Sequence, residues 1–186
     1  MKFDDDIGLL LNAICFSAEK HRNQRRKDIP HSPYINHPIE VLETLWELGG
    51  VRDEAILLAA ILHDTIEDTN TTAEEIEVIF GPEVLSLVLE VSDDKSLPKA
   101  IRKQLQIETA PHKSEGAKLI KLADKLCNVR DTLYSPPVSW PKKRQMEYLL
   151  WTEKVVQGLR GINQSMEEAY DSLMAEGKRK FMMKGM

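Results

Sequence analysis

The chain has 186 residues, of which 42% are hydrophobic and 30% are charged, a balance that suits one globular domain with a substantial core. The net charge of −5 argues against broad nucleic-acid binding, which needs a dominant basic surface. The longest apolar run, Ala55–Leu62, is far shorter than the roughly 20 residues that span a bilayer, and the acidic start Met1–Asp6 is unlike a secretory signal, so we expect a cytoplasmic protein with no membrane or nucleic-acid partner.

Helical patterning recurs along the chain between proline and glycine breaks. Apolar residues at steps of three and four, with caps at several starts, predict helices over residues 5–21, 38–48, 53–64, 72–80, 82–91, 98–110, 114–130, 141–159 and 162–176. No segment alternates in the manner of a β-strand. We therefore predict an all-α domain, a single bundle of about nine helices over residues 1–178, followed by a frayed basic tail at residues 179–186. The cysteines, Cys15 and Cys127, are too few for a disulfide framework, and we expect both to be reduced core residues.

Polar, titratable residues end the most apolar of these helices. His63 and Glu67 are four residues apart, as are Asp64 and Asp68, so each pair shares a face if the helix continues. Burial of such groups is costly unless they are paired or bind a metal. Imidazole and carboxylate ligands together suit a divalent ion such as manganese, iron or zinc.

Two other segments carry residues of the same types. Asp124 and Asn128 share a face of a later apolar helix, and His37 stands directly before a predicted helix start. Singly, each has an ordinary structural explanation, such as an ion pair between Asp124 and a neighbouring lysine. Together with the His63-Asp64 dipeptide, they form the pattern H…HD…D.

This pattern resembles that of the HD-domain metal-dependent phosphohydrolases. Four longer segments are similar to the hydrolase domain of RelA/SpoT-type alarmone enzymes, and above all to the stand-alone small alarmone hydrolases, including the metazoan version: His21–Lys27, Pro33–Pro38, His63–Thr69 and Ala123–Arg130. The resemblance extends over residues 5–175. It implies an HD hydrolase domain that removes the 3′-pyrophosphate of ppGpp or pppGpp, giving GDP or GTP and pyrophosphate, with one Mn²⁺ per chain.

The resemblance also implies roles for particular residues. The metal ligands would be His37, His63, Asp64 and Asp124. Glu67 and Asp68 match the pair that activates or positions the attacking water, and their order of roles stays open. Because this pair is intact, we expect an active enzyme.

A strongly anionic nucleotide needs a local basic pocket in an acidic protein. The resemblance places Arg26 and Lys27 on the guanosine side and gives Asn128 a nucleotide contact, and further candidates are Tyr34, Arg130, Arg144 and Tyr148. The loop from Asp28 to Asn36 is slightly longer than in the long bifunctional enzymes, so Arg26 and Lys27 are placed less securely. His21, His31 and His112 have no partner in the pattern, and we expect them at the surface.

Two other functions stay open at this point. The pocket could accept a ribose phosphate, as in a phosphatase that converts NADPH to NADH. Alternatively, the chain could be a catalytically silent module that binds alarmones, although the intact Glu67-Asp68 pair argues against this. A cyclic-dinucleotide phosphodiesterase would need further histidines and a Gly-Tyr-Pro motif, which the sequence lacks.

Overall fold

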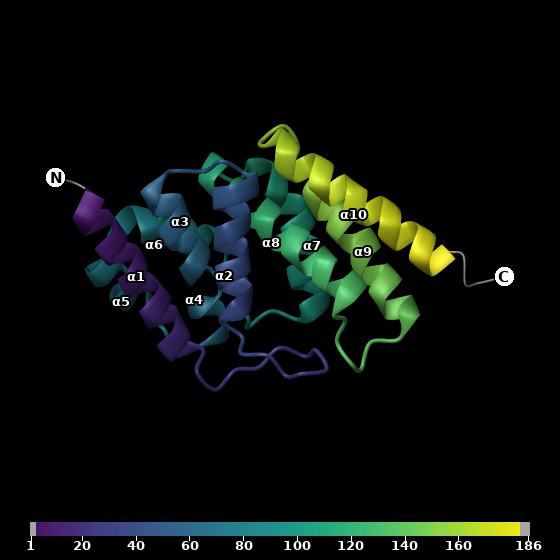
Figure 1. Ribbon diagram of the computed structural model, residues 1–186, viewed down its shortest axis with the longest axis horizontal. Helices are drawn as coiled ribbons and strands as arrows, with labels where there is room; N and C mark the ends of the chain where they lie inside the picture. Colours follow the sequence, from purple (N-terminus) through teal and green to yellow (C-terminus); the bar gives the residue numbers. More distant parts are fainter. Residues whose placement is uncertain (1–2, 183–186) are drawn as a thin grey trace.

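The computed structural model describes residues 3–182, and over this range the prediction of an all-α domain is confirmed (Figure 1). Its helices are α1 (Phe3–Lys20), α2 (Asn36–Glu43), η1 (Thr44–Leu48), α3 (Glu54–Leu62), α4 (Thr65–Asp68), α5 (Ala73–Phe80), α6 (Pro82–Val91), α7 (Lys99–Thr109), η2 (Ala110–His112), α8 (Glu115–Tyr134), α9 (Lys142–Gln157) and α10 (Gln164–Met182). The element η1 is a π-helical continuation of α2, and η2 is one turn of 3-10 helix after α7. None of these helices is long and apolar enough to cross a membrane.

Helices α3 and α8 form the centre of the bundle. Helix α3 packs against α1, α2, α6 and α8, and α8 also packs against α9 and α10. Figure 1 shows α1, α3, α5 and α6 on one side of α2 and α8, with α9 and α10 on the other side. Residues 57–62 of α3 are all buried, which agrees with the apolar composition of this segment. The functional candidates on α3 and α8 are therefore held on the most deeply packed helices.

Three helix starts follow the capping residues of the sequence. The side chain of Asp53 accepts a hydrogen bond from the backbone of Ile56 at the start of α3. Thr72 and Glu75 form the predicted capping box of α5. Ser114 caps α8 in the same way as Asp53 caps α3. These bonds satisfy backbone N–H groups that have no partner within the helix.

Several predicted helix ends differ from the structure, and α8 continues to Tyr134, four residues beyond its predicted end. The helix expected to continue through Asp64 ends at Leu62, and a turn at residues 63–64 separates α3 from α4. At the other end of the chain, α10 continues to Met182, because Lys178 pairs with Glu153 at 2.6 Å and Lys180 bonds to the Leu133 carbonyl. Residues 179–182 of the predicted tail are therefore helical, and residues 183–186 lie outside the described part of the chain.

Two expectations about burial are wrong, and both concern α1. Cys15 is exposed, whereas His21 is only 2% exposed. The buried face of α1 runs through Ala13 and Ser17 to His21 in steps of four residues, which places Cys15 on the opposite face. His21 bonds to Gln24 at 2.7 Å through its Nδ1 atom. Cys127 is buried as expected, and burial raises the pKa of its thiol to about 12.

A cavity at the centre of the bundle should be costly. Leu58 on α3 is 2% exposed, so Leu58→Ala should lower the free energy of unfolding by about 2–5 kcal/mol. Leu89, on the surface of α6, is 48% exposed, and Leu89→Ala should cost less than about 1 kcal/mol. Urea denaturation of both variants checks this prediction. Equal losses in the two variants would contradict the central position of α3.

Candidate active site

The four predicted metal ligands lie together, although they come from three parts of the chain. His37 is in the first turn of α2, His63 and Asp64 form the turn between α3 and α4, and Asp124 is in the middle of α8. The His37 Nε2 atom is 3.2 Å from Asp124 Oδ1 and 4.0 Å from Asp64 Oδ2. The His63 Nε2 atom is 3.1 Å from Asp64 Oδ2. The described residues thus contain a compact cluster of imidazole and carboxylate groups.

The arrangement of His63 fits a divalent cation. Its Nδ1 atom donates a hydrogen bond to the Ala60 carbonyl at 2.7 Å, which leaves the lone pair of the neutral ring on Nε2. This Nε2 atom is buried and has no partner in hydrogen-bonding geometry among the described residues, although Asp64 Oδ2 lies close by. A histidine that binds a metal usually donates its other N–H group to such an oxygen. The lone pair of Nε2 and the carboxylate of Asp64 therefore face a common point where a cation fits.

The electrostatics of the cluster agree with this arrangement. Burial alone would lower the pKa of His63, but without a cation the charges of Asp64 and Asp124 outweigh burial and raise it to about 9. A divalent cation at Nε2 would take the place of that proton. Burial would raise the pKa of Asp124, yet the charge of Lys125 and the contact with His37 hold it well below its usual range. The carboxylates stay ionised at the bottom of a buried site, so the cluster attracts positive charge.

Glu67 and Asp68 lie beside the cluster on α4 and share one cation. Glu67 is 3.2 Å from the ammonium of Lys95, and Asp68 is 2.5 Å from it. Glu67 also accepts a hydrogen bond from the backbone of Asp93 at 2.9 Å. Burial raises the pKa of Glu67 despite these partners. A carboxylate with a raised pKa beside a cluster that can hold a metal cation is suited to taking up a proton.

A cavity of about 360 Å³ opens over the cluster, and most of the predicted substrate residues line it. Of the predicted set, its walls include Arg26, Lys27, Tyr34, Asn128 and Tyr148, together with His37, Asp64, Glu67, Asp68 and Asp124. The hydroxyl of Tyr34 donates to Asp64 at 2.6 Å, and the Asn128 amide donates to Asp124. Both residues therefore orient a predicted metal ligand as well as facing the cavity.

Two of the predicted substrate residues do not line this cavity. Arg130 pairs with Glu40 at 3.1 Å. Arg144 lines a neighbouring cavity of about 280 Å³, which shares Trp140 and Tyr148 with the first. Helix periodicity explains the position of Arg130, because it lies two residues beyond Asn128 and so on another face of α8.

The ion pair of Asp124 with a neighbouring lysine, which the sequence allowed, is made by Lys125 at 2.8 Å. Other residues of the site were not predicted, and among them Lys121 and Trp140 line the main cavity. Asp131, a partner of Arg26, and Glu40 carry carboxylate oxygens near the His37 ring, whose Nδ1 atom is buried without a hydrogen-bond partner in the described part of the chain. The lysine signal was available, since Lys121 and Lys125 lie within four residues of Asp124 on an apolar helix.

An all-α bundle that brings two histidines and two aspartates together is the arrangement of a metal-binding helical domain. The chain matches the HD-domain family model over residues 13–149. The chain therefore belongs to the HD-domain family.

Individual relatives indicate which HD-domain proteins this chain is similar to in sequence and structure. The chain is 53% identical to the guanosine-3′,5′-bis(diphosphate) 3′-pyrophosphohydrolase MESH1 of Xenopus tropicalis, over 92% of this chain and 96% of that one. It is also 53% identical to the human protein of the same name, over 90% and 93% of the two chains. A solved structure described as a metazoan orthologue of SpoT that hydrolyses ppGpp, with a role in starvation responses, superposes with a TM-score of 0.88 at 46% identity. That alignment covers 90% of this chain and 94% of the other.

Proposed function

We propose that the protein hydrolyses the 3′-pyrophosphate of ppGpp and pppGpp, giving GDP or GTP and inorganic pyrophosphate. The observation that carries this proposal is the buried His–Asp cluster at the floor of a cavity, in a chain that is 53% identical to relatives named for this reaction. The cavity walls also carry Arg25, Lys27 and Lys121, which can meet the phosphates of such a substrate. The cytoplasmic location stays a prediction from the sequence.

His37, His63, Asp64 and Asp124 would hold one Mn²⁺. The choice of manganese rests on the family resemblance, and the mixed imidazole and carboxylate donors are compatible with it. A divalent cation held there supplies positive charge that polarises the phosphoryl group and acidifies water. Tyr34 and Asn128 support the set, because each donates a hydrogen bond to one of the aspartates.

The remaining residues would act either in the reaction or in binding of the nucleotide. Glu67 takes the proton from the attacking water, whose oxygen bonds to phosphorus while the bond from phosphorus to the ribose O3′ breaks. The departing O3′ takes up a proton from solvent. Lys95 holds Glu67 and Asp68 in place through its two contacts. Lys27 and Tyr148, which come from distant parts of the chain, both line the cavity and are available to the nucleotide.

A substrate panel tests the proposal. Purified protein with Mn²⁺ would be incubated with ppGpp, pppGpp and NADPH, and the products would be separated by chromatography. We expect GDP or GTP together with pyrophosphate, and no turnover by the His63→Ala control. Conversion of NADPH without cleavage of either alarmone would contradict the proposal and favour the phosphatase alternative. Binding without turnover of any of them would favour the silent module.

Lys27 should act in binding more than in chemistry. It is exposed at the cavity wall, so we expect its charge to act on the bound substrate and on the transition state alike. Lys27→Ala should raise KM for ppGpp more than it lowers kcat, and the effect should shrink as salt screens the lost charge in the parent enzyme. Lys142→Ala, which removes an exposed lysine from the start of α9, is the control. Kinetics of Lys27→Ala that match the parent at both low and high salt would remove Lys27 from the site.

A further inference from the structure

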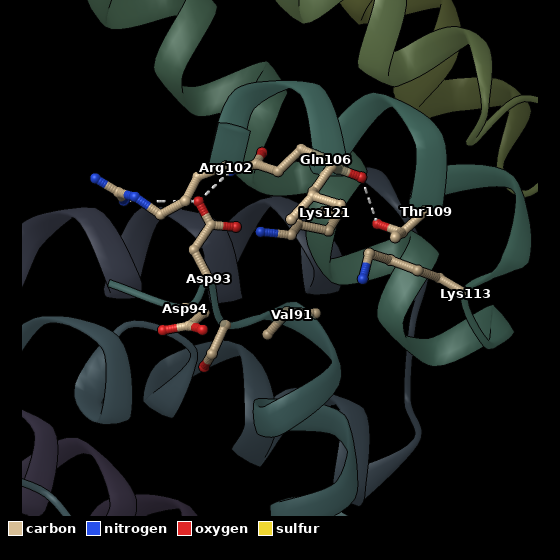
Figure 2. Close-up of a pocket in the computed structure, with 10 residues that line it drawn as sticks. Val91, Asp93, Asp94, Arg102, Gln106, Thr109, Lys113 and Lys121 are labelled. Carbon is tan, nitrogen blue, oxygen red and sulfur yellow. Dashed lines mark hydrogen bonds and ion pairs between the residues drawn. The ribbon is translucent and has the colours of Figure 1, made fainter. Parts of the chain in front are cut away.

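A third, smaller cavity lies beside the candidate active site, between the end of α6, the segment after it, α7 and the first half of α8 (Figure 2). Its volume is about 190 Å³. Pockets for drug-sized ligands measure roughly 300–1,000 Å³, so this one suits a small ion rather than a nucleoside. Gln106 and Lys121 line both this cavity and the main one, which makes the two cavities neighbours.

Lys121 is the unusual residue of this cavity. This residue of α8 is only 7% exposed. Its side chain forms no hydrogen bond or ion pair with another described residue. A buried ammonium group without a partner is costly. Burial first, and then the charge of Lys125, lower the pKa of Lys121.

The three carboxylates whose charges act on Lys121 each have another partner. Glu67 is held by Lys95 and by the Asp93 backbone, and Asp124 is held by Lys125. Asp93 accepts from Gln106 at 2.7 Å, an interaction drawn in Figure 2. Their charges act on Lys121 through space, but none of them forms an ion pair or hydrogen bond with it among the described residues.

A second lysine adds positive charge to this cavity. Lys113, which precedes the start of α8, reaches the same cavity (Figure 2). Among the described residues its hydrogen-bond partner is a neutral group, the backbone carbonyl of Glu90. Arg102 also lines the cavity, but Asp93 and Glu67 each lie 3.8 Å from it. The acidic wall residue Asp94 bonds to the backbone of Ser96. Two ammonium groups thus share one small space, an arrangement that an anion would stabilise.

We propose that this cavity binds inorganic pyrophosphate, held by Lys113 and Lys121. The inference rests on the proposed function for the identity of the anion, because that reaction releases pyrophosphate on the other side of Lys121. A small anion with several charges matches the two ammonium groups and the cavity volume. The site retains the leaving group next to the cluster, so pyrophosphate inhibits the enzyme from a position that the nucleoside does not occupy.

Calorimetric titration of pyrophosphate into the Mn²⁺-loaded protein tests the inference without any nucleotide. The metal cluster also has affinity for pyrophosphate, so the parent should bind two pyrophosphates per chain. Lys113→Gln should weaken the second event by about tenfold or more, the loss expected for one charge-assisted contact. Lys113 lines only the smaller cavity, so this substitution leaves the walls of the main cavity unchanged.

Two further variants complete the design. Lys118→Gln removes a lysine from the same part of α8 without touching either cavity, and it should bind as the parent does. Lys113→Arg keeps the charge and should retain the second event. An isotherm of Lys113→Gln identical to that of the parent would overturn the inference, and so would orthophosphate binding as tightly as pyrophosphate. Cleavage of ppGpp is measured separately, so a failure of the proposed function is distinguishable from a failure of this site.

Discussion

His63→Ala should abolish both bound manganese and activity while the protein stays folded. The substitution removes one imidazole from a cluster whose other members are His37, Asp64 and Asp124. Three ligands rarely hold a labile ion tightly, and we expect ppGpp turnover to fall by roughly 100-fold or more. Asp124→Ala should behave in the same way, and it also removes the partner of Lys125. Elemental analysis and circular dichroism of the purified variants check metal content and fold.

His112→Ala is the control for both substitutions, because His112 is an exposed histidine in the single 3-10 turn after α7. It should keep the manganese content and the turnover of the parent. Full manganese occupancy in both His63→Ala and Asp124→Ala would remove the four-residue cluster as the metal site. A loss of helical signal in Asp124→Ala alone would instead assign part of its effect to the buried charge of Lys125, which is left without a partner.

Glu67→Gln should separate chemistry from binding. An amide cannot take up a proton, so kcat should fall by about 10²- to 10⁴-fold, while manganese content and nucleotide affinity stay near those of the parent. Glutamine keeps the size of the side chain and can still accept from the backbone of Asp93. Single-turnover kinetics with equilibrium binding measure the two effects. Glu77→Gln, on the exposed face of α5, is the matched control.

The pH dependence of turnover supplies a second test of Glu67. Burial raises the pKa of this carboxyl, and a general base acts only when it is deprotonated. Turnover should therefore rise with pH through a pKa above that of an ordinary glutamate, and this acidic limb should be missing from Glu67→Gln. Near-normal turnover of Glu67→Gln at saturating substrate would make Asp68, which shares Lys95 with Glu67, the next candidate.

Local patterns predicted much of the fold. The caps at Asp53, Thr72 and Ser114 and the apolar run of α3 are short-range signals, because each depends on residues within one or two helical turns. The break at His63 and Asp64 was missed, since helix propensity alone continues through them. Tertiary contacts override that propensity, because the turn allows His63 to reach the Ala60 carbonyl and Asp64 to reach Tyr34.

The site shows the same division between local and long-range information. The motif predicted which residues belong together, and His37, His63, Asp64 and Asp124 do lie in one cluster. The motif carried no information about residues that act through distant partners. Lys95 stands almost thirty residues beyond Asp68 in the chain, yet it holds both Glu67 and Asp68.

The sequence by itself determined the helical class, the main helix starts and the identity of the buried polar cluster, because periodicity, caps and motif spacing are properties of neighbouring residues. Only the tertiary structure decided that His21 is buried, that Arg130 turns away toward Glu40, and that Lys121 lies between two cavities. Burial and charge pairing depend on which helices meet, and those contacts join residues far apart in the chain. That Lys121 forms no ion pair with another described residue appears only when the partners of the nearby carboxylates are known.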